Sequence, residues 1–227
     1  MSGKIVYAYS IIPFVTMRCF EQIRLDLAYN NANVKLVGVG AGFTYGSMGS
    51  SHHAIEDISI MRSIPNMSVL CPGDPFETEE LIKRSYEKNG PVYIRLGKNG
   101  EPIIHKNKNR IEIGETINIT EGNDLILITT SNTLELGKSW VDEWNQEGIH
   151  VNLVSMPTIK PINQLSIKKL INLGIPMITL EEHSIIGGLG STISEIIAEN
   201  GKSVKFRRMG INDEFSHHVG SAEFQRK

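Results

Sequence analysis

The sequence predicts an α/β fold made of two three-layer α/β/α domains with mostly parallel sheets. Short β-branched, apolar runs alternate with longer segments whose apolar residues recur at helical spacing, and this alternation occurs twice along the chain. A polar stretch rich in Asn, Gly and Lys separates the two series. We therefore expect a first domain at residues 1–105, a linker at 106–123 and a second domain at 124–227.

The first alternation contains the clearest helix signal of the chain. Asp74 is a good cap, Pro75 suits the first helical position, and Asn89-Gly90 suits a helix end, so we expect a helix from 74 to about 88. Val34 begins a short apolar run typical of a buried strand. The elements expected in this half are strands at 4–9, 34–39, 68–71 and 92–96 and helices at 16–29 and 74–88.

The second alternation repeats the pattern after the polar stretch. In that stretch we expect a short hairpin of residues 110–113 and 116–119 around Gly114-Glu115. The elements expected beyond it are strands at 125–129, 151–156, 177–180 and 204–207 and helices at 134–146, 167–173 and 191–199.

Composition narrows the class of partner. The net charge of the 227 residues is −2, which provides no general attraction to nucleic acid, so none is expected as a partner. The basic run at 106–110 is expected to be solvated linker. Two distant cysteines favour a cytoplasmic protein, and no long apolar run predicts a membrane span.

Residues 40–67 carry the strongest functional signal. Four glycines at 40, 42, 46 and 49 allow sharp turns and close approach of a ligand, and His52 and His53 follow them. We expect a helix to begin at this histidine pair, capped by Ser50 or Ser51. The pair would then lie at the crevice where strands end and helices begin. Because other ligands at suitable spacing are lacking, we expect no metal site on this chain.

Several segments, taken in order, resemble the transketolase family. Its pyrimidine-binding domain has a glycine-rich loop, a Thr-His-Gln-like triplet, a Glu and an Arg-x-apolar-Pro-Asn-apolar stretch. The matching residues are 51–53, Glu56 and 62–67, followed by 72–75 and 90–95. Residues 181–183 and 187–191 resemble the C-terminal domain of the same family. The resemblance covers nearly the whole chain.

This resemblance implies a thiamine diphosphate-dependent enzyme that transfers a two-carbon ketol unit from a ketose to an aldehyde. In the family one domain holds the diphosphate through Mg²⁺, and the other, which this chain resembles, holds the aminopyrimidine. The implied partners are an N-terminal section that carries the diphosphate-binding domain, with Mg²⁺ on it, and a small sugar substrate. The implied assembly is a homo- or hetero-oligomer.

The resemblance also implies roles for five residues. Phe14, in a matching segment, is expected to stack on the pyrimidine, and His52 is expected to be catalytic by bonding a developing alkoxide. Phe14 and the loop that carries His52 are therefore expected to be neighbouring walls of one half-cleft. His53, Arg95 and Lys98 are expected to bind substrate. Lys98 stands where the family has an Arg that helps to hold the substrate phosphate.

The chain departs from the family at four points. It opens after the Gly-Ile-Ala-Glu-Gln-like helix that supplies a carboxylic acid to the pyrimidine, and it ends short of the expected final helix. No Gly-Asp-Gly motif for Mg²⁺-diphosphate occurs, and Met48 replaces an acidic residue that bonds a sugar hydroxyl. We therefore expect a C-terminal section, truncated at both ends or one piece of a split enzyme, that is inactive alone.

Other functions stay open from the sequence. One is a deoxyxylulose-phosphate-synthase-like carboligase, which decarboxylates pyruvate before the same addition, and another is the beta subunit of a 2-oxo-acid dehydrogenase. A third is a non-catalytic assembly subunit. The turn at 187–190 could hold a phosphate at a helix start, although a structural, interface-building role for the C-terminal domain is favoured.

Overall fold

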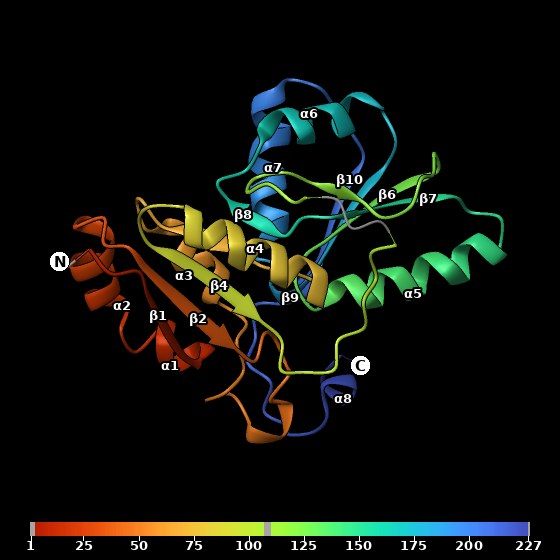
Figure 1. Ribbon diagram of the computed structural model, residues 1–227. Helices are drawn as coiled ribbons and strands as arrows, with labels where there is room; N and C mark the ends of the chain where they lie inside the picture. The colour runs from red at the N-terminus through yellow and green to blue at the C-terminus, as the bar shows by residue number, and fades with distance from the viewer. Residues whose placement is uncertain (1–2, 107–109, 227) are drawn as a thin grey trace.

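The structure is a computed structural model that describes residues 3–106 and 110–226. Within these ranges the chain forms two five-stranded sheets, each with a single antiparallel strand at one edge. Helices pack on both sheets (Figure 1). The predicted α/β fold with two mostly parallel sheets is confirmed.

The first sheet is the middle of three layers and has the order β1-β2-β4-β3-β8. Its strands are β1 (Val6–Ile11), β2 (Val34–Val39), β3 (Ser68–Leu70), β4 (Val92–Leu96) and β8 (Thr158–Lys160). Successive side chains of a strand point to opposite faces. Val92 and Ile94 therefore pack in the apolar cluster that contains α4 (Pro75–Glu87), whereas Tyr93 packs in the cluster that contains α3 (Asp57–Ser63).

The second sheet repeats this layering in the order β10-β9-β6-β7-β5. Its strands are β5 (Ile117–Asn118), β6 (Leu125–Thr129), β7 (Val151–Ser155), β9 (Met177–Ser184) and β10 (Phe206–Ile211). Helix α5 (Thr133–Gln146) packs on one face. Helices α6 (Gln164–Asn172) and α7 (Leu189–Asn200) pack on the other.

The two halves share a core. One apolar cluster contains Ile58 and Met61 of the first half together with Ile193 and Ile196 of the second. Strand β8, which follows β7 in sequence, leaves its own half and pairs antiparallel with β3. The first sheet therefore includes residues from beyond 124, where we expected a separate domain to begin; the proposed domain boundaries themselves stay a prediction.

The helix expected at 16–29 is wrong as a single element. The chain forms α1 (Ile12–Thr16), α2 (Phe20–Gln22) and a π-helical turn η1 (Ile23–Tyr29). The backbone of Cys19, with φ −105° and ψ 18°, leaves the helical region and separates the first two pieces. Phe14 consequently lies on a short helix of its own, directly after β1.

The helix expected at the histidine pair begins later, at Asp57, and neither Ser50 nor Ser51 caps it. Gly42 and Ala54 form an antiparallel bridge, with backbone N to O distances of 3.0 and 2.9 Å. This bridge holds Ala54 extended, so His52 and His53 lie in the loop. A short 3-10 turn, η2 (Gly46–Met48), shapes that loop.

The hairpin expected around Gly114 is also wrong. Ile117–Asn118 pairs antiparallel with β7, because the second sheet offers an open edge there. Ile111 is 4% exposed and packs with the α4 cluster. Most of the basic run at 106–110 lies outside the described residues. The short helix α8 (Ala222–Gln225) closes the described chain.

Among the helices of the described ranges, none combines the length and the apolar character needed to span a membrane.

Candidate active-site region

A glycine-rich loop joins the end of β2 to α3, at the edge where the parallel strands of the first sheet end. Gly40 has φ +94° and Gly42 has φ +59°, backbone conformations that residues other than glycine rarely adopt. A Cβ atom on Gly40 would overlap the ring of Tyr45, and one on Gly42 would overlap the carboxylate of Glu182. Glycine is therefore required at both positions by conformation and by space.

Phe14 and His52 are neighbours at this edge. Their ring centroids lie 5.1 Å apart, with the rings meeting edge to face at 68°. Phe14 comes from the helix after β1, and His52 from the loop after β2. Because β1 and β2 are adjacent and parallel, the segments that follow them meet at one edge. The predicted proximity of the two residues is confirmed.

Two further side chains extend this aromatic group. The ring of Tyr45 lies 6.4 Å from that of His52, and the guanidinium carbon of Arg18 lies 4.1 Å from the ring centroid of Phe14. Arg18 therefore covers part of a ring that a flat ligand would use. A heterocycle that stacks on Phe14 must displace Arg18 or use the opposite face.

His53 points inward and is only 3% exposed. Its Nε2 lies 3.2 Å from the Gly46 carbonyl oxygen, and its ring meets that of Phe43 edge to face at 5.0 Å. Its Nδ1 is buried and has no hydrogen-bond partner among the described residues. The contacts of His53 are with the loop itself, so its direct contact with substrate stays a prediction without geometric support.

Arg95 is buried at the junction of the two halves, with 1% of its surface exposed. Its Nε donates to Asp57, its Nη1 to Ser131, and its Nη2 to the backbone carbonyls of Ala54 and Glu182, at distances of 2.9 to 3.0 Å. The guanidinium offers no free face to a substrate. The substrate role expected for Arg95 has no support in this arrangement, which indicates a structural role instead.

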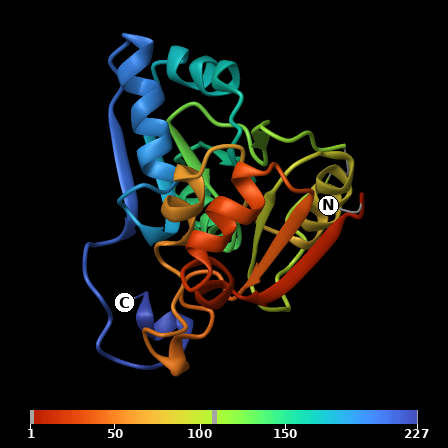
Figure 2. The ribbon, with the colours of Figure 1, turned by 90° about the vertical axis from the view of Figure 1, so that its left-hand side faces the viewer.

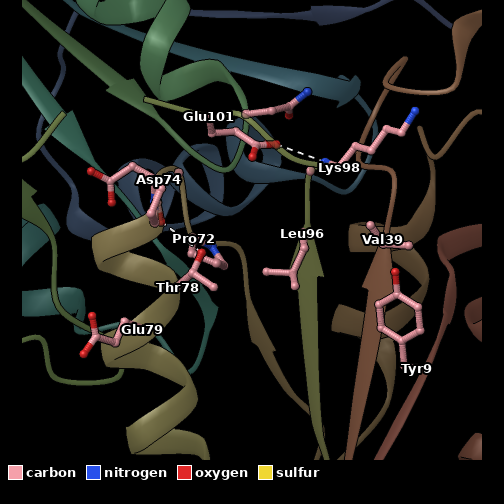
Figure 3. A pocket seen from close by; sticks show the side chains of 13 residues that line it. Tyr9, Val39, Pro72, Asp74, Thr78, Glu79, Leu96, Lys98 and Glu101 are labelled. Carbon is pink, nitrogen blue, oxygen red and sulfur yellow. Dashed lines mark hydrogen bonds between the residues drawn. The ribbon is translucent and has the colours of Figure 1, made fainter. Parts of the chain in front are cut away.

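Lys98 is exposed and lies beyond the end of β4. Its Nζ is 5.5 Å from the ring centroid of Tyr45, so a chain of side chains connects Phe14, His52, Tyr45 and Lys98. Lys98 also lines a pocket of about 390 Å³ between the ends of β2 and β4 and the start of α4. Figure 3 shows Tyr9, Val39 and Leu96 on the strand side of this pocket and Asp74, Thr78 and Glu79 on the α4 side. Of the five predicted site residues, only Lys98 lines it.

The turn before α7 is already occupied by a carboxylate. Glu181 accepts hydrogen bonds from the amides of Leu189 and Gly190 at 2.7 and 2.8 Å. Burial raises the pKa of Glu181 from 4.5 to about 7, although these amides and the Arg95 charge oppose the shift. Since this carboxylate fills the helix start, the suggested phosphate site at 187–190 is wrong for this structure.

A second cluster of titratable side chains binds the segment around Ile104 and His105, which follows β4, to the start of α4. The Asp74 carboxylate caps α4 through the Glu77 amide and accepts from the amide of Ile104 and from the amide and Nδ1 of His105, the last at 2.8 Å. Burial opposes ionisation of Asp74, but the His105 and backbone bonds prevail and lower its pKa to about 2. Burial raises the pKa of the neighbouring Glu77 from 4.5 to about 7.

Three residues near the site escaped sequence reasoning: Arg18, Tyr45 and Glu182. Tyr45 carried a usable signal, since it is one of two aromatic residues, with Phe43, between Gly42 and Gly46 in the loop. Arg18 and Glu182 lie in segments that resemble the family, but the sequence carried no sign of their individual roles, because those roles depend on which residues they meet across the fold. Among the described residues, no three His, Cys, Asp or Glu side chains gather as metal ligands would.

The chain matches two family models. Residues 1–101 match the transketolase pyrimidine-binding domain, and residues 114–226 match the transketolase C-terminal domain. A protein of Methanocaldococcus jannaschii assigned as a transketolase C-terminal section is 42% identical over 216 residues, which cover 94% of this chain and 67% of that protein. A subunit of the apulose-4-phosphate transketolase of Actinobacillus succinogenes is 34% identical over 213 residues, covering 94% and 68%.

Solved structures show the same similarity. A split-gene transketolase, described as an inactive beta4 tetramer, has a TM-score of 0.86 and 35% identity, covering 95% of this chain and 69% of that chain. A transketolase from Campylobacter jejuni has a TM-score of 0.76 at 15% identity, a likeness of fold, and this chain spans 33% of it. The matched region is therefore about two thirds of a split-gene chain and one third of a single-chain protein.

Proposed function

Because this chain belongs to the transketolase family, we propose that it is the pyrimidine-binding and C-terminal section of a thiamine diphosphate-dependent ketol transferase. The enzyme moves a two-carbon ketol unit from a ketose to an aldehyde. The observation that supports this function most directly is the pairing of Phe14 and His52, with centroids 5.1 Å apart, at the strand ends of the first sheet.

The residues present suit the aminopyrimidine half of the cofactor. Phe14 is a half-buried aromatic ring with a polar neighbour, His52, at its edge. A flat heterocycle gains from stacking on such a ring. When bound, thiamine diphosphate supplies the carbanion chemistry, and the protein supplies position and hydrogen bonds. Phe14 would hold the heterocycle, and Arg18 would move aside or remain on the opposite face.

His52 is the residue that acts on the substrate in this proposal. Its imidazole is half-buried and lies on the loop between two aromatic rings, where it would donate a hydrogen bond to an oxygen that gains negative charge during the reaction. Ser51 Oγ lies 3.0 Å from His52 Nδ1, which orients the ring and leaves Nε2 for the substrate. Exposed Lys98 would attract an anionic group at the far end of a small sugar.

The diphosphate and Mg²⁺ do not fit the described part of this chain, since no suitable group of carboxylates occurs there. We propose that a separate N-terminal section holds both, and that an oligomer joins the two sections. The relatives named as a split-gene transketolase and as a transketolase subunit support this division. A cytoplasmic location stays a prediction.

A carboligase that decarboxylates pyruvate is the second candidate. A 1-deoxy-D-xylulose-5-phosphate synthase of Bacillus velezensis is 32% identical over 206 residues, although this chain spans only 32% of it. Ketol transfer is favoured because the subunit-sized relatives carry transketolase names. A non-catalytic assembly subunit is the third candidate.

Reconstitution separates these functions. This chain is mixed with the diphosphate-binding section of a split transketolase, thiamine diphosphate and Mg²⁺, and is assayed with a ketose donor and an aldehyde acceptor. Ketol transfer that requires both sections is expected. Carbon dioxide release from pyruvate in place of ketol transfer would favour the carboligase. Inactivity with every partner section that binds would favour the assembly subunit. Calorimetry on the chain alone is expected to show weak or no thiamine diphosphate binding.

A further inference from the structure

Glu182 lies at a meeting point of three segments that are distant in sequence. It is 5% exposed and stands near the end of β9. Its Oε1 accepts from the backbone amide of Phe43 at 2.7 Å and from the side-chain amide of Asn132 at 3.0 Å. Its Oε2 pairs with Arg226. One buried carboxylate thus contacts the glycine-rich loop, the start of α5 and the C-terminal segment.

The base of the glycine-rich loop is held from both sides at this point. Gly42 and Ala54 bridge the two legs of the loop, and Phe43 on the first leg donates to Glu182. On the second leg, the Ala54 carbonyl accepts from Arg95, which also donates to the backbone carbonyl of Glu182. His52 and His53 lie within the segment that this base closes.

The tip of the loop is held by the C-terminal segment. Ser50 Oγ donates to the Ser216 carbonyl at 2.9 Å, and the Gly220 amide donates to the Gly46 carbonyl at 3.4 Å. Figure 2 shows this segment leaving β10 and crossing to the loop that follows β2. Arg226 then brings the segment back to Glu182, so the same carboxylate holds the base of the loop and the element that supports its tip.

We propose that Glu182 is a positioning residue: it clamps the glycine-rich loop and the C-terminal segment together and thereby sets the position of His52 against Phe14. Gly42 shows how close this contact is, because a Cβ there would overlap the Glu182 carboxylate. This inference rests on the proposed function only for its consequence, a His52 held ready for substrate. The clamp itself is a property of the chain alone.

The test measures loop order rather than turnover. Hydrogen exchange of the Phe43 amide and the His52 Hε1 resonance are followed by NMR in the wild-type chain and in Glu182→Ala. Phe43 exchange is expected to accelerate at least about tenfold. The Phe43 amide loses its hydrogen bond to a charged group, so the local opening that exposes this amide to solvent costs less free energy. The His52 resonance is expected to move toward its value in a short peptide, since the nearby Phe14 ring no longer shifts it.

Two milder variants separate the clamp from general destabilisation. Glu182→Gln keeps an oxygen for the Phe43 amide and loses the charge pair, so slow Phe43 exchange with faster exchange at Gly220 is expected. Arg226→Lys keeps the charge and is expected to restore Gly220 protection relative to Arg226→Ala. Glu195→Gln removes an exposed carboxylate that pairs with Arg62 and is the matched control.

Two outcomes would overturn the clamp. One is unchanged Phe43 exchange and an unchanged His52 resonance in folded Glu182→Ala. The other is equal loosening of the loop in Glu195→Gln. The clamp and the proposed function fail separately, because absent ketol transfer in the wild-type reconstitution overturns only the function.

Discussion

The Nε atom of Arg95 lies 2.9 Å from the Asp57 carboxylate, and their side chains are 1% and 0% exposed. Tyr93 also donates to this carboxylate at 2.6 Å. Arg95 reaches from here to carbonyls of both halves of the chain. The pair therefore connects the core of the first sheet to the base of the glycine-rich loop and to β9.

Removing one member of this pair is expected to destabilise the fold strongly. Asp57→Asn leaves the Arg95 charge buried without its counter-ion, and such a loss costs about 3–5 kcal/mol. Urea denaturation of the isolated chain measures the change. Glu79→Gln, which breaks an exposed pair with Lys83, is the control and should change stability by less than about 1 kcal/mol. Equal small effects of the two variants would contradict a structural role for Arg95.

Gly42→Ala is expected to destabilise the chain more than Gly201→Ala. Both glycines have positive φ, +59° and +70°, so each alanine incurs the left-handed cost of about 1–2 kcal/mol. Only at Gly42 would the new Cβ also overlap a side chain, that of Glu182, whereas nothing lies within 4 Å at Gly201. Thermal denaturation of the two variants compares them. An equal drop in melting temperature for Gly42→Ala and Gly201→Ala would refute the overlap.

His52→Ala is expected to lower kcat/KM of the reconstituted enzyme by about 100-fold or more, because a hydrogen bond to the developing charge is lost. Stability should change little, since His52 is only half-buried. Steady-state ketol transfer and urea denaturation test the two statements. His150→Ala, which removes an exposed histidine after α5, is the matched control. Full activity of His52→Ala would exclude a catalytic role.

Phe14→Leu is expected to weaken thiamine diphosphate binding by the reconstituted pair about tenfold, because stacking of a base on an aromatic ring is worth about 1–3 kcal/mol. Leucine keeps an apolar side chain at the site and removes the ring. Calorimetric titration measures the dissociation constant. Tyr86→Leu removes an aromatic ring that is 62% exposed on α4 and should leave binding unchanged. An unaltered affinity of Phe14→Leu would rule out stacking at this residue.

Stability is expected to fall between pH 4.5 and 7. Burial raises the pKa values of Glu77 and Glu181 from 4.5 to about 7. A carboxyl group whose pKa is higher in the folded chain than in the unfolded chain stabilises the fold fully at a pH below its pKa in the unfolded chain. This stabilisation is lost as the pH rises through the pKa in the folded chain, and the loss is about 3 kcal/mol per group. Urea denaturation at pH 5 and pH 7.5 measures the slope.

Glu181→Gln should remove about half of this slope, because Glu77 still titrates. Glu195→Gln, with its exposed carboxylate, is the control and should keep the full slope. A slope as steep in Glu181→Gln as in the wild type would contradict the raised pKa of Glu181. Asp74 acts at lower pH: its pKa of about 2 contributes stability that is lost as the pH falls through that value.

Sequence reasoning succeeded where structure depends on neighbours along the chain. The strands Val34–Val39, Val92–Leu96 and Leu125–Thr129 were predicted with their observed bounds, because each is a short apolar run next to a turn signal. Helix α4 was predicted from Asp74 and Pro75, since a cap is a local contact. The proximity of Phe14 and His52 followed from the family pattern and from the rule that parallel strands end at one edge.

The sequence by itself therefore determined the two α/β alternations, the glycine-rich loop and the family, because each of these depends on residues that are close together along the chain. Only the tertiary structure decided that β8 crosses to the first sheet and that Arg95 is buried. It also decided that Glu181 binds the amides at the start of α7 and that Glu182 contacts Phe43 and Arg226. The physical reason is that a polar side chain's role depends on the partners and the burial that the fold provides, and residues as distant as Phe43 and Glu182 meet only after the chain has folded.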